Sequence, residues 1–420
     1  MNQATLDFAR QHRDDDVRQL ALRGARGADG VDMHQALQQI SGYQTACRKL
    51  PLWAACDVIE YPVRLSMEQS SSQATAWYKR GLVAGLAQGR DGRFADLTGG
   101  LGVDFSFMAP CFSHATYVER NHELCSLARR NMAALGIRNA SFVEDSAEHV
   151  LPALPHQSLV FVDPARRDTA GRRLFLVTDC QPDVAAMHDE LVAKADVVLL
   201  KLSPMLDIRH ALRTLPATRR VHVVAVDGKC KELLFVLSAS ELDSTALNII
   251  STGLNLNSTG LKEGCTPITA VNLPADGDGA APTDALTFTY DEEYSAAVSY
   301  ATAIGRFVYE PNAAVLKAGA FRTVAARYNI YKVAADSHLY TADNLVPDFP
   351  GRTFAVHGVQ AMRSARTLAA GLTHANVLTR NFPLAPDELR RRLRLKDGGS
   401  EYIIGTTDNQ GQHILIRASR

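Results

Sequence analysis

Short apolar runs alternate with helical stretches between Arg93 and about Ser240, and this alternation limits the folds open to the chain. The runs are rich in β-branched residues: RFADL, ATYVE, ASFVED, SLVFVD, ADVVLLKL, VHVVAV and LLFVLSAS. Strands that alternate with helices form a mostly parallel sheet with helices on both faces. Runs without polar alternation, such as VVLL, are typical of strands buried on both sides. We therefore predict an α/β fold with a doubly wound sheet over residues 91–250.

The two segments that flank this region differ from it in composition. Residues 1–90 are predicted to form an N-terminal helical region, because DVRQLALRGA and MHQALQQISGYQTACRKL place their apolar residues three and four positions apart. Residues 251–290 are rich in Gly, Ser, Thr, Pro, Asn and Asp. That composition predicts a loop-rich linker.

The last 130 residues predict an α+β domain. Helices are expected over residues 312–328 and 362–370, and a further helix is expected to begin at Pro386. The expected strands are RTFAVHGV, NVLTRNF, YIIGTT and HILIRA. A DNQG turn joins the last two strands, which indicates a hairpin. With this domain, the chain of 420 residues fits a prediction of two or three domains.

Composition excludes several classes of protein. Hydrophobic residues make up 46% of the chain and charged residues 21%, unlike a disordered or fibrous protein. The seven cysteines include no CxxC pair, which favours reduced thiols over a zinc site or a disulfide framework. No apolar run approaches the ~18 residues of a membrane span, and the opening MNQATLDFARQHRDDD has no apolar signal-peptide core. We expect a cytoplasmic protein with no metal and no membrane contact.

The net charge of zero is the sum of two opposed parts. Residues 301–420 hold 16 Lys/Arg and 9 Asp/Glu, a net charge of +7, so residues 1–300 carry −7. An overall balance argues against a polyanionic partner, but a basic C-terminal part favours one.

The strongest chemical signal is DLTGGLGVD, which runs from Asp96 to Asp104 directly after the first predicted strand. Gly99, Gly100 and Gly102 lack side chains where strand turns into helix, so the backbone can approach a ligand closely. A glycine-rich turn alone is weak evidence, because such turns also occur without a ligand.

Acidic residues end the next three strands and strengthen this interpretation. Glu119 follows Asp96 by 23 residues, where doubly wound folds place a carboxylate for ribose hydroxyls. Asp145 is placed to receive an adenine amine, and Asp163 ends the fourth strand. An acid at Asp96 would repel a pyrophosphate but suits the sulfonium and ammonium of S-adenosylmethionine. We therefore favour S-adenosylmethionine over a nicotinamide cofactor, while any one acid taken alone is equally well explained as a strand-end cap.

Several motifs carry a resemblance to a known family. They are LSMEQSSSQATAWYK (65–79), ADLTGGLGVDFSFMA (95–109), YVERN (117–121), VDPARRD (162–168), KLSPMLDI (201–208), CKELL (230–234), YEPNAAVLKAGAF (309–321), SHLYTAD (337–343), DFPGR (348–352), RNFP (380–383) and LKDGG (395–399). Together they resemble class I S-adenosylmethionine-dependent methyltransferases of a bacterial group with a C-terminal THUMP-like domain. The resemblance implies a Rossmann-like catalytic domain at 91–250, a small ferredoxin-like segment at 291–343 and a THUMP-like basic domain at 344–420.

The predicted cofactor site combines these signals. The loop 98–102 is expected against the methionine part, Glu119 on the ribose and Asp145 on the adenine. The resemblance implies that Glu68 and Gln69 meet the methionine end, although the run Ser70–Ser72 is equally well explained as a helix cap. The full set of expected cofactor residues is Gln69, Asp96, Thr98, Gly99, Gly100, Gly102, Asp104, Glu119, Arg120, Asp145, Ser146 and Asp163.

The fourth strand is expected to carry the catalytic residues Asp163, Pro164 and Arg166. Methyltransferases that modify exocyclic amines have an (Asp/Asn)-Pro-Pro-aromatic loop here, which holds the amine and stacks on a flipped base. The chain has Asp163-Pro164-Ala165-Arg166, so the second proline and the ring are missing. An arginine can stack on a base instead. Cys180 is the nearest candidate for a pyrimidine C5 nucleophile, but a small buried hydrophobic residue is the favoured interpretation.

The basic C-terminal part predicts contacts with RNA phosphates. The candidate residues are Arg380, Arg390, Arg391, Arg392, Arg394 and Lys396. A solvated helix face explains the same charge run equally well. We predict a methyltransferase that modifies an exocyclic amine or ring nitrogen in tRNA or rRNA. The alternatives are methylation of a protein or small molecule, a nicotinamide-dependent oxidoreductase and a non-catalytic RNA-binding module.

Overall fold

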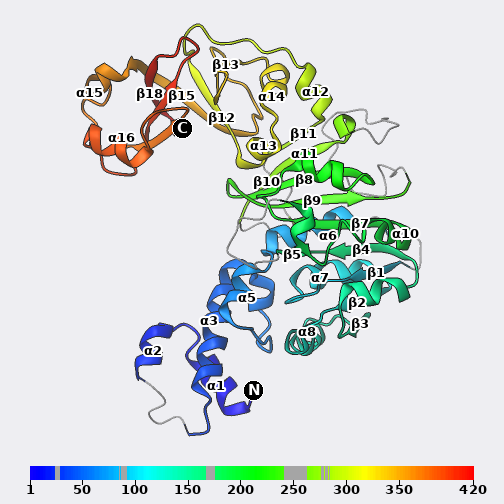
Figure 1. Ribbon diagram of the computed structural model, residues 1–420. Coiled ribbons are helices and arrows are strands. Elements are labelled where there is room, and N and C mark those ends of the chain that lie inside the picture. The colour runs from blue at the N-terminus through cyan, green and yellow to red at the C-terminus, as the bar shows by residue number, and fades with distance from the viewer. Residues whose placement is uncertain are drawn as a thin grey trace. The chain divides into compact units, whose positions relative to one another are not determined.

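The structure is a computed structural model that describes residues 1–23, 29–84, 86, 92–166, 176–240, 263–275, 279, 282 and 284–420 (Figure 1). The chain divides into two compact units, and each is described by itself. The first comprises Met1–Arg220, Glu232–Ser251 and Leu273–Ala281. The second comprises Val221–Lys231, Thr252–Asn272 and Pro282–Arg420.

Within the described residues, nine strands form a sheet in the order β11-β10-β8-β9-β7-β4-β1-β2-β3. Strands β3, β2, β1, β4 and β7 run parallel, and β9 pairs antiparallel with β7. The strands are β1 (Arg93–Asp96), β2 (His114–Val118), β3 (Ala140–Val143), β4 (Gln157–Val162), β7 (Ala195–Leu202), β8 (Thr218–Val226), β9 (Lys229–Leu237), β10 (Ile268–Leu273) and β11 (Asp284–Phe288). All seven strands predicted between Arg93 and Ser240 are present. The α/β prediction is therefore confirmed.

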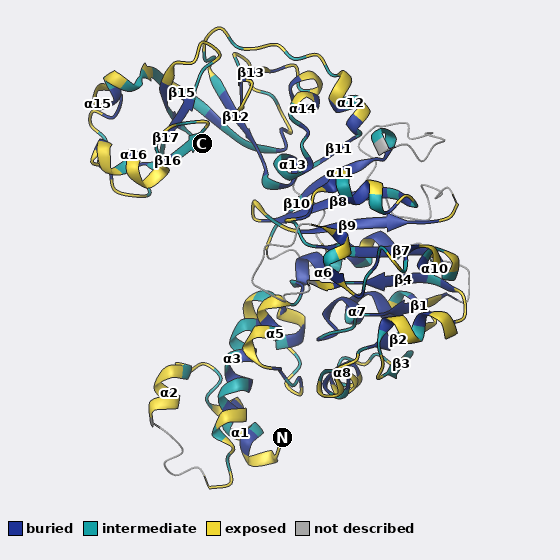
Figure 2. Ribbon diagram, viewed as in Figure 1, coloured by how far each residue is buried: buried dark blue, intermediate teal, exposed yellow. Residues whose placement is uncertain are grey.

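The central strands are buried because their side chains are apolar on both faces (Figure 2). Every residue of β4 from Leu159 to Val162 is at most 1% exposed. Continuous burial like that of β4 is expected for parallel strands covered by helices. Two short strands, β5 (Ala165–Arg166) and β6 (Cys180–Gln181), pair antiparallel after β4.

The helices of the first unit begin at polar capping residues. Ser72, Asn121 and Asp207 each accept a hydrogen bond from a backbone N–H of the first turn that follows. The helices are α1 (Gln3–Gln11), α2 (Val17–Arg23), α3 (Met33–Lys49), α4 (Pro51–Ala54), α5 (Arg64–Gln69), α6 (Gln73–Val83), α7 (Val103–Met108), α8 (His122–Ala134), α9 (Ala147–Val150), α10 (His188–Lys194) and α11 (Ile208–Thr214). The predicted helical character of the N-terminal region is confirmed.

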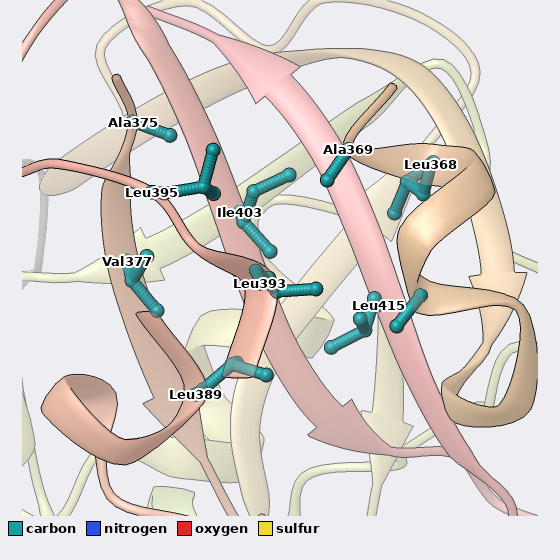
Figure 3. Packing of buried hydrophobic residues seen from close by; sticks show 10 residues of the cluster. Leu368, Ala369, Ala375, Val377, Leu389, Leu393, Leu395, Ile403 and Leu415 are labelled. Atoms are coloured by element: carbon teal, nitrogen blue, oxygen red, sulfur yellow. The ribbon is translucent and has the colours of Figure 1, made fainter. Parts of the chain in front are cut away.

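The second unit contains a seven-stranded sheet in the order β13-β14-β12-β15-β18-β17-β16, counted over the residues the structure describes. Its elements are α12 (Tyr290–Ser295), β12 (Phe307–Pro311), α13 (Ala313–Ala318), α14 (Phe321–Arg327), β13 (Tyr331–Ala334), β14 (Ser337–Ala342), β15 (Gly351–Ala361), α15 (Ala365–Leu368), β16 (Asn376–Arg380), α16 (Pro386–Leu393), β17 (Glu401–Thr407) and β18 (His413–Ser419). Strands β17 and β18 form the predicted hairpin. Leu389 and Leu393 of α16 pack with Ile403 and Leu415 of that hairpin (Figure 3).

Two predictions about this part of the chain were wrong in detail. Residues 251–290 were expected to be a loop-rich linker, but Ile268–Leu273 and Asp284–Phe288 form β10 and β11, which pair with each other; residues 251–262 lie outside the described residues. Their alternating apolar residues are few and lie beside polar segments, which hid them in the composition. The single helix expected over 312–328 is two helices, because Gly319 adopts a left-handed φ of +84° and ends α13.

Candidate functional site

Two carboxylates lie at the point where the order of the parallel strands reverses. Strand β1 lies between β2 and β4, and Asp96 ends β1 while Asp163 follows β4. Thr98 links the two: its N–H donates to Asp96 Oδ1 at 3.0 Å, and its Oγ1 accepts from the Asp163 N–H at 2.6 Å. Open α/β sheets bind ligands at the carboxyl edge of such a reversal. The geometry therefore marks this edge as the candidate functional site.

The glycine-rich loop packs against the ring of Tyr117. A Cβ on Gly99 would lie 2.1 Å from the Tyr117 ring, so the loop and the ring are in direct contact. Gly100 and Gly102 have φ values of +56° and +83°, which favour glycine. The Gly100 N–H donates to Glu119 Oε2 at 2.9 Å. Each predicted glycine is thus required either by space or by backbone conformation.

The acids that follow β2 and β3 have local partners as well. Glu119 Oε1 accepts from the Asn121 N–H at 2.8 Å, so both of its oxygens bind backbone N–H groups. Asp145 is exposed and accepts from the Ser146 N–H at 2.7 Å, a hydrogen bond that lowers the pKa of Asp145. Ser146 caps α9, and the side chain of Arg120 is exposed. The cofactor role of Glu119, Arg120, Asp145 and Ser146 therefore stays a prediction.

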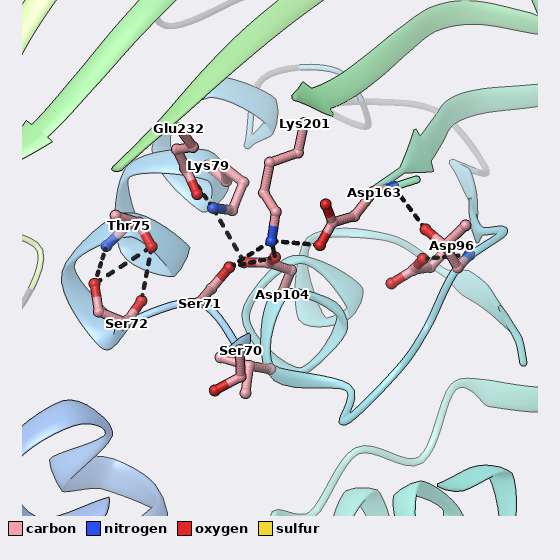
Figure 4. A network of polar contacts seen from close by, with 12 residues as sticks. Ser70, Ser71, Ser72, Thr75, Lys79, Asp96, Asp104, Asp163, Lys201 and Glu232 are labelled. Atoms are coloured by element: carbon pink, nitrogen blue, oxygen red, sulfur yellow. Dashed lines mark hydrogen bonds and ion pairs between the residues drawn. The ribbon is translucent and has the colours of Figure 1, made fainter. Parts of the chain in front are cut away.

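A buried ionic network lies beside these carboxylates (Figure 4). Lys201 Nζ lies 2.5 Å from Asp163 Oδ2 and 3.3 Å from Asp104 Oδ2. Lys79 Nζ lies 3.2 Å from Asp104 Oδ1 and 2.5 Å from Glu232 Oε1. The side chain of Lys79 is 0% exposed, and that of Lys201 is 12% exposed. Positive and negative groups therefore alternate from Glu232 to Asp163.

Burial and charge act in opposite directions on these groups. Burial alone would raise the pKa of Asp104, but Lys79 and Lys201 hold it below its usual range. Burial alone would lower the pKa of Lys201, and the neighbouring carboxylates raise it. Burial raises the pKa of Asp163, whose side chain is 38% exposed, while Lys201 opposes that rise.

Among the described residues, no lysine or arginine pairs directly with Asp96. Burial raises the pKa of Asp96 well above its usual range, and the charges of Asp104 and Asp163 add to that rise. The Thr98 N–H opposes it. Perturbed carboxyl groups at one sheet edge are typical of functional sites.

Residues from five of the sequence motifs meet in this network. Ser71 donates from Oγ to Asp104 Oδ2 at 2.6 Å and accepts from Lys201 Nζ at 3.0 Å. The motifs 65–79, 95–109, 162–168, 201–208 and 230–234 each contribute at least one member. Ser71, Lys79, Lys201 and Glu232 were not among the predicted site residues. The signal for Lys79 and Glu232 was their place within the motifs 65–79 and 230–234.

Other predicted residues lie in simpler surroundings. Gln69 is exposed at the end of α5, and Glu68 pairs with Arg64 at 2.7 Å. Pro164 and Cys180 are buried, as favoured for Cys180 in the sequence. The backbone of Arg166 lies in β5, and its side chain falls outside the described residues.

Among the described residues, no three His, Cys, Asp or Glu side chains gather as potential metal ligands. Within the same residues, no helix combines the length and the apolar character needed to cross a bilayer.

The basic residues of the second unit fall into two groups. Arg391, Arg392, Arg394 and Lys396 are exposed on α16 and the turn after it. Arg390 instead lies 2.8 Å from Asp387 and 3.0 Å from Asp397. Arg380 pairs at 2.5 Å with the buried Glu310, which also pairs with Arg352. The structure therefore separates four exposed cations from two that hold carboxylates.

Comparisons with known proteins agree with this architecture. Residues 307–350 match a family described as a ferredoxin-like domain, and residues 351–420 match one described as THUMP domain-like. The crystal structure of a protein from Porphyromonas gingivalis W83, assigned as a methyltransferase, is similar with a TM-score of 0.83 and 32% identity, over 99% of this chain and 97% of that one. An uncharacterized S-adenosylmethionine-dependent methyltransferase of Mycobacterium tuberculosis (strain ATCC 25618 / H37Rv) is 25% identical over 84% of this chain and 87% of its own.

The fold and these relatives define a class I methyltransferase. The chain belongs to the S-adenosylmethionine-dependent methyltransferase family whose members carry a C-terminal THUMP-like domain. Its cofactor is S-adenosylmethionine, so the nicotinamide-dependent and non-catalytic alternatives are excluded. The resemblance seen in the motifs is confirmed.

Proposed function

We propose that this methyltransferase modifies a nitrogen of a nucleobase, either an exocyclic amine or a ring nitrogen, in structured tRNA or rRNA. The observation that carries the proposal is the THUMP-like domain at 351–420, on which Arg391, Arg392, Arg394 and Lys396 are exposed. Exposed cations clustered on one segment suit phosphate contacts, which position an RNA without reading its sequence. The same chain therefore combines a methyl-transfer domain with a surface for a polyanion.

The residues of the sheet edge fit the cofactor chemically. S-adenosylmethionine supplies an electrophilic methyl group on a cationic sulfur. Buried carboxylates such as Asp96 suit its positive groups, and Glu119 and Asp145 offer acceptors for ribose and adenine. We assign the remaining cofactor contacts to the loop 98–102 and to Gln69, Arg120 and Ser146.

Asp163 is assigned to the substrate. A carboxylate after the fourth strand can accept a hydrogen bond from an N–H of the base and so aim the nitrogen lone pair. Orientation of this kind in a site without bulk water supplies much of the rate of a two-reactant step. Pro164 and Arg166 are assigned to the wall that meets the base, with the guanidinium in the place of the aromatic ring of other amine methyltransferases.

This assignment divides the work between parts of the chain. Residues 91–250 would transfer the methyl group, 291–343 would form the small ferredoxin-like segment, and 344–420 would bind RNA. The proposed place of action is the cytoplasm. A methyltransferase for a protein or small molecule shares every cofactor feature and is the competing function.

The test is mass spectrometry of nucleosides from total tRNA and rRNA of strains with and without the gene. One methylated nucleoside is expected to disappear without the gene and to return with the wild-type gene but not with Asp163→Ala. RNA from the deletion strain should then accept tritiated methyl groups from the purified protein. If every methylated nucleoside persists and that RNA accepts no label, the RNA proposal fails while the cofactor assignment stands.

A further inference from the structure

The ammonium of Lys201 faces three oxygens from three separate elements. Its Nζ lies 2.5 Å from Asp163 Oδ2, 3.0 Å from Ser71 Oγ and 3.3 Å from Asp104 Oδ2 (Figure 4). An ammonium has three N–H donors, so these contacts account for all of them. A lysine with every donor used is held in place and cannot turn toward solvent. These contacts therefore fix the orientation of the Lys201 side chain.

The three oxygens are themselves held. Ser71 donates to Asp104 at 2.6 Å, and the second oxygen of Asp104 lies 3.2 Å from Lys79 Nζ. Lys79 in turn pairs with the buried Glu232. Asp163 is the one carboxylate of the network whose side chain is substantially exposed, at 38%. The network thus ends at the residue that we assign to the substrate.

This inference rests on the function proposed above. We propose that Lys201 is the positioning residue of the reaction, which keeps Asp163 ionised and holds its Oδ2 so that Oδ1 is presented to an N–H of the substrate. Lys201 does not touch the substrate in this arrangement. It acts through Asp163.

The charges around Asp163 explain why a cation is needed. Among the described residues, Lys201 on β7 and Lys79 on α6 lower the pKa of Asp163, and the carboxylate of Asp104 on α7 raises it. Asp96 on β1 lies at the same sheet edge, and the charge of Asp163 raises the pKa of Asp96. Lys79 is already engaged by Asp104 and Glu232, so Lys201 is the cation in contact. Without it, Asp163 would become neutral more readily and would lose its fixed orientation.

The chemistry requires an acceptor more than a strong base. The substrate nitrogen uses its lone pair to form the N–C bond, while the S–C bond breaks and its electron pair stays on sulfur, which leaves S-adenosylhomocysteine. When the substrate is an exocyclic amine, the methylated nitrogen then bears a positive charge and an acidic proton, which passes to Asp163. Because that cation is strongly acidic, a carboxylate weakened by an ion pair still accepts its proton. Orientation by Lys201 therefore costs little in basicity.

The test compares Lys201→Met, Lys201→Arg and wild type with RNA from the deletion strain as methyl acceptor. Lys201→Met is expected to lower kcat by about 100-fold, as misplaced reacting groups do, and to leave the Kd for S-adenosylhomocysteine within about 3-fold. The acidic limb of the kcat profile should move to higher pH, because loss of Lys201 raises the pKa of Asp163. Lys201→Arg, which keeps the charge, should restore part of kcat and the original limb. Lys194→Met is the control: it replaces the last residue of α10, whose ammonium donates to the carbonyls of Pro152 and Leu154, and it should keep wild-type kcat.

The outcomes separate the two proposals. If the wild-type protein transfers no methyl group to RNA, the proposed function fails. If the wild type is active and Lys201→Met retains its kcat and its acidic limb, the role of Lys201 is overturned. Should Lys201→Met not fold, Asp104→Asn removes one of the two carboxylates that Lys201 contacts, and the double variant is compared with Asp104→Asn alone by the same two measurements.

Discussion

Lys79 and Glu232 are 153 positions apart in the chain and meet at 2.5 Å between Nζ and Oε1. The exposed fraction of the two side chains is 0% and 6%. Burial raises the pKa of Glu232, and the charge of Lys79 opposes that rise. A buried pair of this kind is stabilised by mutual attraction, and either partner left alone is a buried charge without compensation.

Lys79→Met is therefore expected to destabilise the protein strongly. Removal of one partner of a buried ion pair costs about 3–5 kcal/mol in free energy of unfolding. Urea unfolding followed by circular dichroism measures the change. The matched control is Arg64→Met, which breaks the exposed pair with Glu68 and should cost less than about 1 kcal/mol. Equal losses in the two variants would contradict the role of burial.

Gly99→Ala tests the contact between the glycine-rich loop and Tyr117. The added Cβ would lie 2.1 Å from the ring, so the loop must shift, at a cost of about 1–3 kcal/mol in stability. A displaced loop should also weaken binding of S-adenosylhomocysteine, measured by titration calorimetry. Gly81→Ala on α6 is the control, because a Cβ there meets nothing within 4 Å and alanine favours a helix. Unchanged affinity in Gly99→Ala would place the cofactor elsewhere.

The raised pKa of Asp96 predicts how the apo protein responds to pH. Because its folded-state pKa lies above the ordinary value, the contribution of Asp96 to stability is complete below that value and is lost as pH rises toward the raised pKa. Asp96→Asn should remove this loss. The thermal midpoint of the apo variant should therefore exceed that of the wild type at neutral pH, measured by differential scanning calorimetry. A lower midpoint would mean that the ionised carboxyl has a stabilising partner.

Cofactor binding should respond to the same group with the opposite sign. A cationic cofactor favours ionised Asp96, so the affinity for S-adenosylmethionine should rise as pH increases above the ordinary pKa of an aspartate. Asp96→Asn should bind more weakly and show no such rise. Asp145→Asn is the control for the pH dependence, because the pKa of Asp145 is lowered rather than raised. An unchanged pH dependence in Asp96→Asn would remove Asp96 from the cofactor site.

Asp163→Asn separates substrate orientation from cofactor binding. The amide keeps the shape of the side chain but loses its negative charge. Methyl transfer to RNA is expected to fall by about 100-fold or more, within the range for a positioned acid–base group. Binding of S-adenosylhomocysteine should change little, because Asp163 is assigned chiefly to the substrate. A variant with full activity would show that Asp163 serves only as a cap at the end of the strand.

The exposed arginines predict a specific salt dependence. Loss of each phosphate contact should reduce the slope of log affinity against log salt concentration by about 0.7–0.9. We expect a triple glutamine variant of Arg391, Arg392 and Arg394 to bind RNA more weakly and with a shallower slope, measured by filter binding. Arg417→Gln is the control, because Arg417 pairs with Glu401 at 2.8 Å. Equal slopes would assign the RNA contacts to another surface.

The sequence was sufficient for the architecture of the first unit. Apolar runs of strand length, separated by helical patterns, predicted the strands correctly because each strand is buried on both faces. The glycines of the loop could also be predicted from the sequence. Gly99 is required because a side chain would collide with the Tyr117 ring, and Gly100 and Gly102 are required because their φ angles are positive. Strands β10 and β11 were missed because their few apolar residues lie beside polar, loop-like segments.

The sequence predicted only part of the candidate site. Carboxylates at strand ends, such as Asp96 and Asp163, were found because parallel strands bring their carboxyl ends to one edge. The partners of Asp104 were not found, since Lys79 lies on a helix before the sheet and Lys201 lies on a strand 97 residues after Asp104. Among the basic residues, the sequence could not separate exposed Arg391 from Arg380, whose charge is used by buried Glu310.

The sequence by itself determined the alternation of strands and helices, the glycine-rich turn and the basic character of the C-terminal part. These features depend on local composition and spacing, which short-range physics converts into elements. The tertiary structure alone decided which charges meet, because an ion pair such as that of Lys79 and Glu232 depends on the packing of elements remote in the chain. It thereby joined five separate motifs into one network that ends at Asp163.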